Sequence, residues 1–377
     1  MELIFHPVED AFKEAVAQRV FPGAVALVGK GEEIIFESAF GCRSLIPEKA
    51  PMQLDTIFDL ASLTKPLATA PAIMLLAREK KIRLDDRVTR FFPNFGVFGK
   101  NHVTFRHLLA HCSGLPAWRP YYEDIVKRER DGRIDFVASR AAKSYVFEQI
   151  HREKDVRPPG TQSLYSDLGY MLLGEVVEET GGRTLDRYCQ EKIFRPMGLH
   201  STSFIDLTEL RTRRLQLVPE KVAPTEECPW RKRVLCGEVH DDNAYAMGGV
   251  AGHAGLFSCA RDIHHFLIRL RKCLRGDDPF LPAPLVREFL TRDETVKGST
   301  HALGWDTPSA EDSSSGSYFS PNSVGHLGFT GTSIWWDLEK DCHVILLSNR
   351  VHPSSYSNKI RTFRPYIHDL IMKTALS

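Results

Sequence analysis

The chain has 377 residues, of which 42% are hydrophobic and 26% are charged, values typical of a soluble globular protein. These values exclude a disordered or fibrous chain, and the length suits one large domain or two closely packed ones. The 49 Lys and Arg residues balance 48 Asp and Glu residues, for a net charge of +1, whereas nucleic-acid binding through counterion release needs a basic excess. The longest apolar run, around residues 68–77, is broken by Pro71 and is too short to span a bilayer. We therefore expect neither a nucleic-acid partner nor a membrane partner.

The N-terminal segment and the cysteines bear on location and on metal binding. The first residues, MELIFHPVEDAFKEAVAQ, lack a basic segment followed by an apolar one, so we expect no signal peptide and a cytoplasmic protein. The eight cysteines follow no framework spacing, and we expect them to be reduced thiols. Cys228, Cys236 and His240 lie close in sequence without a CxxC pair, so we expect neither a zinc ion nor any other cofactor.

Strand patterns lie at both ends of the chain, and helical patterns lie between them. Residues 2–19 carry apolar side chains at helical spacing, which predicts an amphipathic first helix. Two apolar, β-branched runs then flank Lys30-Gly31-Glu32 and predict an antiparallel hairpin. A second hairpin is predicted in residues 333–350, where two runs flank residues 338–341, and a final helix is predicted from about Arg361 to Ser377.

This distribution predicts an α+β fold built on one antiparallel sheet, because hairpins rather than βαβ units connect the strands. Both terminal hairpins would join that sheet, and the end helices would cover it. We predict that residues 1–85 and 290–377 form this α/β part, and that residues 86–289 form an inserted, mostly helical region. The Ser-rich segment Ser309–Ser323 is predicted to be a mobile loop.

Two common active-site motifs are absent from the sequence. No G-x-S-x-G occurs, so the nucleophile elbow of α/β-hydrolases is missing, and no G-x-x-x-x-G-K-[ST] occurs, so there is no P-loop. The glycine-dense stretch Gly248–Gly255 lacks the opening of a phosphate-binding loop, and we interpret it as a tight backbone turn.

Ser62 and Lys65 are the first candidates for chemistry, at the start of a helical pattern that runs to Ala77. Because they are three residues apart, both side chains project from one face near the helix N-terminus. A serine hydroxyl needs a nearby base to act as a nucleophile, and lysine can be that base only if burial or a neighbouring cation lowers its pKa. The Ser-x-x-Lys pattern also occurs by chance about once in a chain of this length, and Ser62 could simply cap the helix beside a solvated Lys65.

Two later stretches could supply further polar groups. Tyr165-Ser166-Asp167 precedes an apolar helical segment, where Ser166 or Asp167 could equally be a helix cap. The stretch Gly325–Ser333 leads into a strand, and its glycines let a ligand or another backbone approach closely, although a bulged strand entry would explain them as well. The remaining residues of interest receive structural or surface interpretations: His111 and His253 as structural, His264 and His265 as surface residues, and Trp335 and Trp336 as pointing to opposite faces of a strand.

In this order, Ser62-x-x-Lys65, Tyr165-Ser166-Asp167 and His326-x-Gly328 resemble the three signatures of the penicillin-recognising serine hydrolases. This superfamily includes class C β-lactamases, D-alanyl-D-alanine carboxypeptidases and β-lactamase-like esterases. The resemblance spans about residues 20–355, because four further stretches also look like that family: residues 56–61, 108–116, 252–257 and 346–350. It implies a β-lactamase/transpeptidase-like α/β sandwich with helices on both faces of the sheet and an active site between the sheet and the inserted region.

The resemblance also implies a role for each motif residue. Ser62 would attack an ester or amide carbonyl, Lys65 and Tyr165 would share the proton transfers, and Tyr165 would then activate the water that releases the acyl group. By the same analogy, the backbone N–H groups of Ser62 and Phe329 would form the oxyanion hole. Four further residues would line the substrate site: Asp167, His326, Gly328 and Thr330.

Two motif residues depart from the pattern common in this superfamily. His326 stands where β-lactamases carry a lysine that attracts a substrate carboxylate, and histidine is largely neutral at pH 7. Asp167 stands where asparagine is common, and its carboxylate would raise the pKa of Lys65 and shift the base role towards Tyr165. We therefore expect a small-molecule substrate with an ester or amide carbonyl. A β-lactamase or D-alanyl-D-alanine carboxypeptidase, and a non-catalytic ligand-binding member, stay as alternatives.

Overall fold

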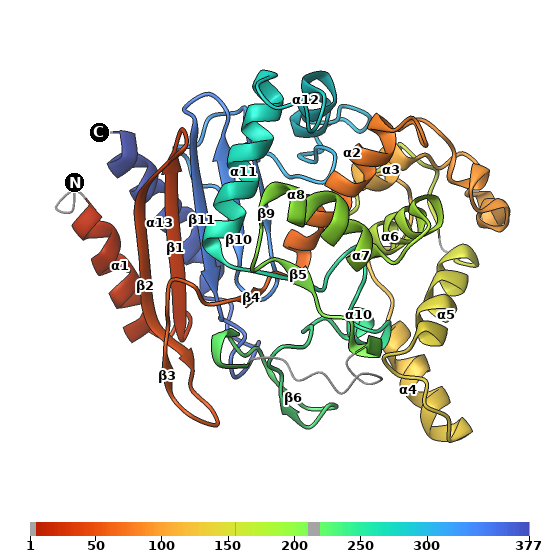
Figure 1. Ribbon diagram of the computed structural model, residues 1–377, viewed down its shortest axis with the longest axis horizontal. Coiled ribbons are helices and arrows are strands. Elements are labelled where there is room, and N and C mark those ends of the chain that lie inside the picture. Colours follow the sequence, from red (N-terminus) through yellow and green to blue (C-terminus); the bar gives the residue numbers. More distant parts are fainter. Residues whose placement is uncertain (1–4, 155, 210–218, 377) are drawn as a thin grey trace.

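A six-stranded antiparallel sheet forms one side of the molecule (Figure 1). The computed structural model describes residues 5–154, 156–209 and 219–376. The strand order is β3-β2-β1-β11-β10-β9, so strands from the two ends of the chain lie side by side. The strands of this sheet are β1 (Gly23–Lys30), β2 (Glu33–Ser44), β3 (Ala50–Pro51), β9 (Ser323–Leu327), β10 (Ser333–Asp337) and β11 (Cys342–Ser348).

Each terminal hairpin is closed by a short polar turn, as the sequence predicts. Between β1 and β2, Gly31 has a φ of 61°, a left-handed conformation that glycine adopts at little cost. Between β10 and β11, the buried Asp337 carboxylate accepts hydrogen bonds from the amides of Glu339 and Lys340. The antiparallel pairing of β1 with β11 joins the two hairpins. The prediction of one antiparallel sheet built from both chain ends is confirmed.

Helices cover both faces of this sheet. Helices α1 (His6–Ala17) and α13 (Ile360–Leu376) lie on one face, and α11 (Ala260–Arg275) lies on the other (Figure 1). On β10, Trp335 belongs to the core under the terminal helices and Trp336 to the core shared with the helical region. The two indoles therefore point to opposite faces, as predicted, and both are buried because both faces are covered.

Helices of the middle segment form the other side of the molecule (Figure 1). Helix α6 is central there, because it contacts α2, α3, α5 and α7 and buries most of its residues. A small sheet of order β4-β8-β5 lies beside these helices. The remaining elements are β4 (Phe58–Asp59), α2 (Ala70–Arg78), α3 (Phe105–Leu109), α4 (Tyr121–Gly132), α5 (Arg140–His151), α6 (Asp167–Gly181), α7 (Leu185–Cys189), α8 (Arg195–Met197), β5 (Ser203–Phe204), β6 (Glu227–Cys228), β7 (Arg233–Val234), α10 (Asp242–Ala246), β8 (Leu256–Ser258) and α12 (Ala283–Leu290).

Helix α11 belongs to the segment 86–289 but packs against β1 and β11 of the main sheet. The inserted segment thus supplies one layer of the sheet's cover, and the division at residues 85 and 290 stays a prediction. This packing overturns one interpretation, because His264 is buried on the inner face of α11, with its Nδ1 2.8 Å from His343 Nε2. Of the predicted surface pair, only His265 is exposed.

Hydrogen bonds tie part of the Ser-rich segment Ser309–Ser323 to the rest of the fold, and its mobility stays a prediction. The amide and the hydroxyl of Ser320 each donate to the Asp337 carboxylate at 2.7 Å. The amide of Ser317 donates to Asp369 on α13. These serines therefore dock the segment against β10 and α13.

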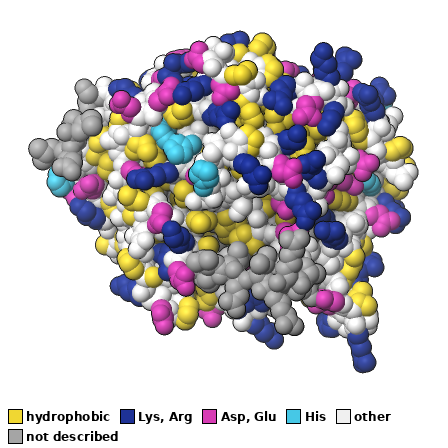
Figure 2. Space-filling model, in the orientation of Figure 1, with side chains coloured by type: hydrophobic (Ala, Val, Ile, Leu, Met, Phe, Trp, Pro, Cys, Tyr) yellow, Lys and Arg dark blue, Asp and Glu magenta, His cyan; other side chains and the backbone are white. Residues whose placement is uncertain are grey.

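Acidic and basic side chains are interspersed over the described part of the face in Figure 2, without a wide area of a single sign. Across residues 5–154, 156–209 and 219–376, no helix combines the length and the apolar character needed to cross a bilayer.

Candidate active site

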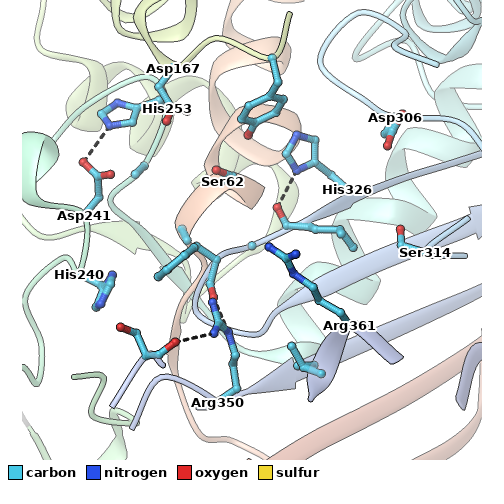
Figure 3. A pocket seen from close by; sticks show the side chains of 18 of the residues that line it. Ser62, Asp167, His240, Asp241, His253, Asp306, Ser314, His326, Arg350 and Arg361 are labelled. Atoms are coloured by element: carbon cyan, nitrogen blue, oxygen red, sulfur yellow. Dashed lines mark hydrogen bonds and ion pairs between the residues drawn. The ribbon is translucent and has the colours of Figure 1, made fainter. Parts of the chain in front are cut away.

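A cavity of about 1110 Å³ opens between the β9–β10 turn, the segment before α2 and the first residues of α6 and α13. In Figure 3, Ser62 lies between Asp167 and His253 on one side and His326 on the other. The structure thus brings most of the predicted site residues to the lining of one cavity: Ser62, Tyr165, Asp167, His326, Gly328 and Phe329.

Ser62 lies in a tight turn between β4 and α2. Residues Ala61–Leu63 form a 3-10 turn, Lys65–Thr69 form a wider π-helical turn, and α2 begins only at Ala70. The predicted helical stretch from Ser62 to Ala77 is present, but its first turns are not α-helical, since Pro71 lacks the N–H that an α-helix would need at that position. Such π-helical turns occur often at functional sites.

The residue before Ser62 has a strained backbone. Ala61 has a φ of 47°, a left-handed conformation that costs a residue with a Cβ on the order of 1–3 kcal/mol. Its amide donates to the buried Asp59 carboxylate at 2.8 Å, and the same carboxylate accepts the His240 amide at 2.6 Å. Asp59 therefore holds the turn that sets the direction of Ser62.

Lys65 is fully buried and donates to three oxygen atoms. Its Nζ lies 3.0 Å from Ser62 Oγ, 2.8 Å from Asp167 Oδ1 and 3.1 Å from the His253 carbonyl oxygen. Burial by itself lowers the pKa of Lys65, but the Asp167 carboxylate and the Tyr165 phenol outweigh burial, so the net direction is upward. Lys65 is therefore an ammonium ion at neutral pH, with all three of its N–H donors satisfied.

Tyr165 completes this group. Its phenol interacts with both Lys65 and Ser62, and Lys65 Nζ lies 4.8 Å from the centre of its ring. Burial raises the pKa of Tyr165, and the Asp167 charge adds to that rise, whereas Lys65 and Ser62 lower it without reversing it. The resting site thus holds an ammonium ion and a neutral phenol, so a proton must leave this pair before either can act as a base.

The start of α6 fixes the position of Tyr165. The hydroxyl of Ser166 accepts from the Gly169 amide at 3.3 Å and donates to the Pro116 carbonyl at 2.6 Å, so Ser166 is the N-cap of this helix. The Ser166 amide donates to His111 Nδ1 at 3.0 Å, and the His111 ring stacks on Tyr165 with 4.4 Å between ring centres. The cap interpretation of Ser166 is correct, and the cap places Tyr165 just outside the helix, beside Lys65.

His326 on β9 is a neutral residue of the cavity wall. Its Nδ1–H donates to the Leu327 carbonyl at 2.9 Å. Burial and the neighbouring Lys65 cation lower the pKa of His326 to about 3. His326 therefore supplies no positive charge at neutral pH, as expected when it replaces lysine in the third motif.

Thr330 departs from its predicted place. Its hydroxyl is buried and donates to the Asp59 carbonyl at 2.7 Å, and Thr330 is not among the residues that line the cavity. It ties the third motif to the turn under Ser62 instead of facing a substrate. Gly328 packs directly against Thr332 and the Leu60 carbonyl and leaves no room for a side chain. A Cβ there would lie 2.0 Å from Thr332 Oγ1 and 2.5 Å from the Leu60 carbonyl oxygen.

The sequence profile of the Beta-lactamase family matches residues 8–365. The chain belongs to the Beta-lactamase family. A protein of Escherichia coli (strain K12), provisionally named a D-alanyl-D-alanine carboxypeptidase, is 32% identical over 362 residues, which cover 88% of this chain and 79% of that protein. The family resemblance of the three motifs is therefore confirmed, and the chain is a β-lactamase-like serine hydrolase.

Solved structures show the same fold. The octameric penicillin-binding protein homologue from Pyrococcus abyssi has a TM-score of 0.72 at 23% identity, covering 97% of this chain and 77% of that one. EstCE1, a hydrolase with promiscuous acyltransferase activity, has a TM-score of 0.72 at 20% identity, covering 98% of each chain. The predicted β-lactamase-like α+β fold is therefore confirmed.

A histidine–carboxylate pair on the cavity wall was not predicted. His253 Nε2 lies 2.9 Å from Asp241 Oδ1, as the dashed line in Figure 3 marks. Burial by itself would raise the pKa of Asp241, but His253 and the Ala244 amide lower it. His253 is thus structural, as interpreted, and it also links this pair to the site, because its carbonyl accepts from Lys65. No sequence pattern marks Asp241, since the two partners lie on separate loops.

Other polar residues at the far end of the cavity also escaped sequence analysis. Arg350, Arg361 and Arg364 gather there, after β11 and on the first turns of α13.

His240, considered above as a zinc ligand, has its Nε2 3.0 Å from Glu226 Oε2. In the part of the chain that the structure describes, no three His, Cys, Asp or Glu side chains are grouped to hold a metal ion.

Proposed function

We propose that this protein cleaves a carboxylic ester or a small amide through an acyl-enzyme on Ser62. The observation that carries the proposal is the 3.0 Å contact between Lys65 Nζ and Ser62 Oγ, at the edge of a cavity of about 1110 Å³ that Tyr165 also lines. A serine hydroxyl becomes an effective nucleophile when such groups can take its proton and stabilise the charge that results.

In the first step, Tyr165 loses its phenolic proton to solvent, and the Ser62 proton then passes to the resulting phenolate while Oγ attacks the substrate carbonyl. The Lys65 ammonium has no lone pair to accept that proton, but its charge stabilises the phenolate form of Tyr165. The amides of Ser62 and Phe329 would hold the negative oxygen of the tetrahedral intermediate, and the loss of such a donor costs about 3–4 kcal/mol.

The second half of the reaction uses the same groups in reverse. Tyr165 returns its proton to the departing alcohol or amine as the carbonyl re-forms, which leaves the acyl group on Ser62. Water then attacks this ester and gives a proton to Tyr165. When the intermediate collapses, Ser62 takes that proton back and the acid is released, so Tyr165 is again the phenolate that began the cycle.

A D-alanyl-D-alanine carboxypeptidase is a second candidate, because the Escherichia coli relative carries that provisional name. Such a substrate ends in a carboxylate, and Figure 3 shows the cationic Arg361 side chain reaching into the cavity. His326 argues in the other direction, since its low pKa leaves no positive charge at the third motif.

The test compares p-nitrophenyl esters, a labelled penicillin and a peptide ending in D-alanyl-D-alanine as substrates. We expect ester hydrolysis by the wild-type protein and its loss in Ser62→Ala, with kcat/KM lower by at least about 10³-fold. Ser163→Ala is the matched control, because Ser163 lies two residues before Tyr165 and bonds to Ser299 instead. Hydrolysis by Ser62→Ala at the wild-type rate would refute the proposal, and a preference for the peptide would favour the second candidate.

A further inference from the structure

Arg364 of α13 is buried behind the turn that contains Phe329. Its side chain is almost inaccessible, and Nη2 donates to the carbonyl oxygens of Gly328 at 3.1 Å and Thr332 at 3.0 Å. Within the turn, the Gly331 amide also donates to the Gly328 carbonyl at 3.1 Å, and the Gly328 amide donates to the Thr332 carbonyl at 2.8 Å. Arg364 is thus bonded directly to the peptide group that precedes Phe329.

No carboxylate neutralises this guanidinium group. Across the described residues, Arg364 forms no ion pair, and its Nε has no hydrogen-bond partner. Burial, together with the positive charges of Arg350 and Arg361, lowers the pKa of Arg364 to about 10, so it is still cationic at neutral pH. Burying a cation without a counter-charge costs stability. The Arg364 guanidinium lies next to the Gly328–Phe329 peptide, whose N–H would face the negative oxygen of the proposed reaction.

Peptide geometry connects Arg364 to that charge. In a trans peptide, the Gly328 carbonyl and the Phe329 N–H lie in one plane and point in opposite directions. A guanidinium that holds the carbonyl oxygen therefore also fixes the direction of the N–H. The hydrogen bond polarises the peptide group as well, which makes the N–H a stronger donor. Among the hydrogen bonds formed by the described residues, none uses the Phe329 amide as donor, so it is free for a ligand.

We propose that Arg364 is a positioning residue for acyl transfer, which orients and polarises the Gly328–Phe329 peptide so that the Phe329 N–H stabilises the oxyanion. The inference rests on the proposed function, in which Ser62 attacks a carbonyl group. Arg350 offers a matched comparison, because its Nε donates to the Phe329 carbonyl at 2.9 Å. That carbonyl belongs to the next peptide group, so the two arginines hold one turn but act on different amides.

The experiment measures kcat and KM for a p-nitrophenyl ester and for the matching thionoester, in which sulfur replaces the carbonyl oxygen. Sulfur is a poor hydrogen-bond acceptor, so the oxyanion hole contributes mainly to the oxygen ester. Full loss of one oxyanion donor costs about 10²–10³-fold in kcat. We therefore expect Arg364→Met, which only weakens one donor, to lower kcat for the oxygen ester about tenfold, with KM nearly unchanged.

The ratio of the two rates separates positioning from general damage. In Arg364→Met, kcat for the oxygen ester falls more than kcat for the thionoester, so the ratio of the oxygen-ester rate to the thionoester rate falls. Arg364→Lys keeps the charge and restores part of this ratio. Arg350→Met keeps the wild-type ratio even if individual constants change. Equal losses for both esters in Arg364→Met, or a loss in KM alone, would overturn the proposal.

Two further outcomes are decisive. If Arg364→Met does not fold, the shorter neutral variant Arg364→Gln takes its place, and a wild-type ratio in that folded variant overturns the inference. If the wild-type protein shows no Ser62-dependent hydrolysis, the proposed function itself fails and this inference fails with it. Normal Ser62-dependent hydrolysis with an unchanged ratio removes only the role of Arg364.

Discussion

Replacing Asp167 by asparagine is expected to move the pH dependence of catalysis towards lower pH. Burial lowers the pKa of Lys65 and raises that of Tyr165, and the Asp167 carboxylate raises both. Deprotonation of this pair makes Ser62 reactive in the proposed mechanism. Removal of the negative charge therefore lets the reactive form appear at lower pH, whichever of the two groups accepts the proton.

The size of this effect follows from the contact between Asp167 and Lys65. Two unit charges 2.8 Å apart interact by about 6 kcal/mol when the effective dielectric constant is about 20. The Asp167 side chain is 19% exposed, so solvent screens part of that interaction. Because one pH unit corresponds to about 1.4 kcal/mol, we expect the alkaline rise of kcat to shift by about one pH unit or more.

The assay measures kcat for a p-nitrophenyl ester between about pH 5 and pH 10, with spontaneous hydrolysis subtracted. Glu179→Gln is the control, because Glu179 is an exposed carboxylate on the same helix, twelve residues (about 18 Å) further along. We expect this control to keep the wild-type profile. An unchanged profile in Asp167→Asn, or a shift to higher pH, would refute the reasoning.

Three further predictions concern the base, the third motif and acid stability. Tyr165→Phe is expected to lower kcat by about 10²–10⁴-fold in steady-state assays, because it removes the proposed proton carrier, and a loss below tenfold would exclude that role. Gly328→Ala is expected to destabilise the protein by at least about 1–3 kcal/mol, because its Cβ would lie 2.0 Å from Thr332 Oγ1; an unchanged midpoint of urea unfolding contradicts this. Burial lowers the pKa of His326 and of His343 to about 3. Between about pH 6.5 and pH 5, these two imidazoles therefore take up protons only in the unfolded chain. Each histidine then lowers the free energy of unfolding by about 2 kcal/mol between pH 6.5 and 5, and a constant melting temperature over this range would contradict it.

The sequence predicts those parts of the fold that local patterns determine. Apolar, β-branched runs and polar turns mark both terminal hairpins, so the antiparallel sheet and the opposite directions of Trp335 and Trp336 could be predicted. The site motifs could be found because three short patterns occur in a fixed order. The cytoplasmic location stays a prediction, as do the domain boundaries.

The features that escaped prediction depend on contacts between distant segments. His264 looks like a surface residue in sequence, and only the packing of α11 on the sheet buries it against His343. Thr330 lies inside a motif, yet its hydroxyl turns towards the Asp59 carbonyl, 271 positions away in the chain. The contact of Arg364 with the third-motif turn follows from where α13 docks, and no local pattern encodes it.

The most direct test of the central claim is the mass of the adduct formed with a fluorophosphonate probe. The probe reacts with activated serine hydroxyls, and Ser62 lies 3.0 Å from Lys65 Nζ at the edge of the cavity. The account predicts a single phosphonyl group on the peptide that contains Ser62, which is absent in Ser62→Ala. A wild-type protein that takes no label, or takes it on another residue, would contradict the account.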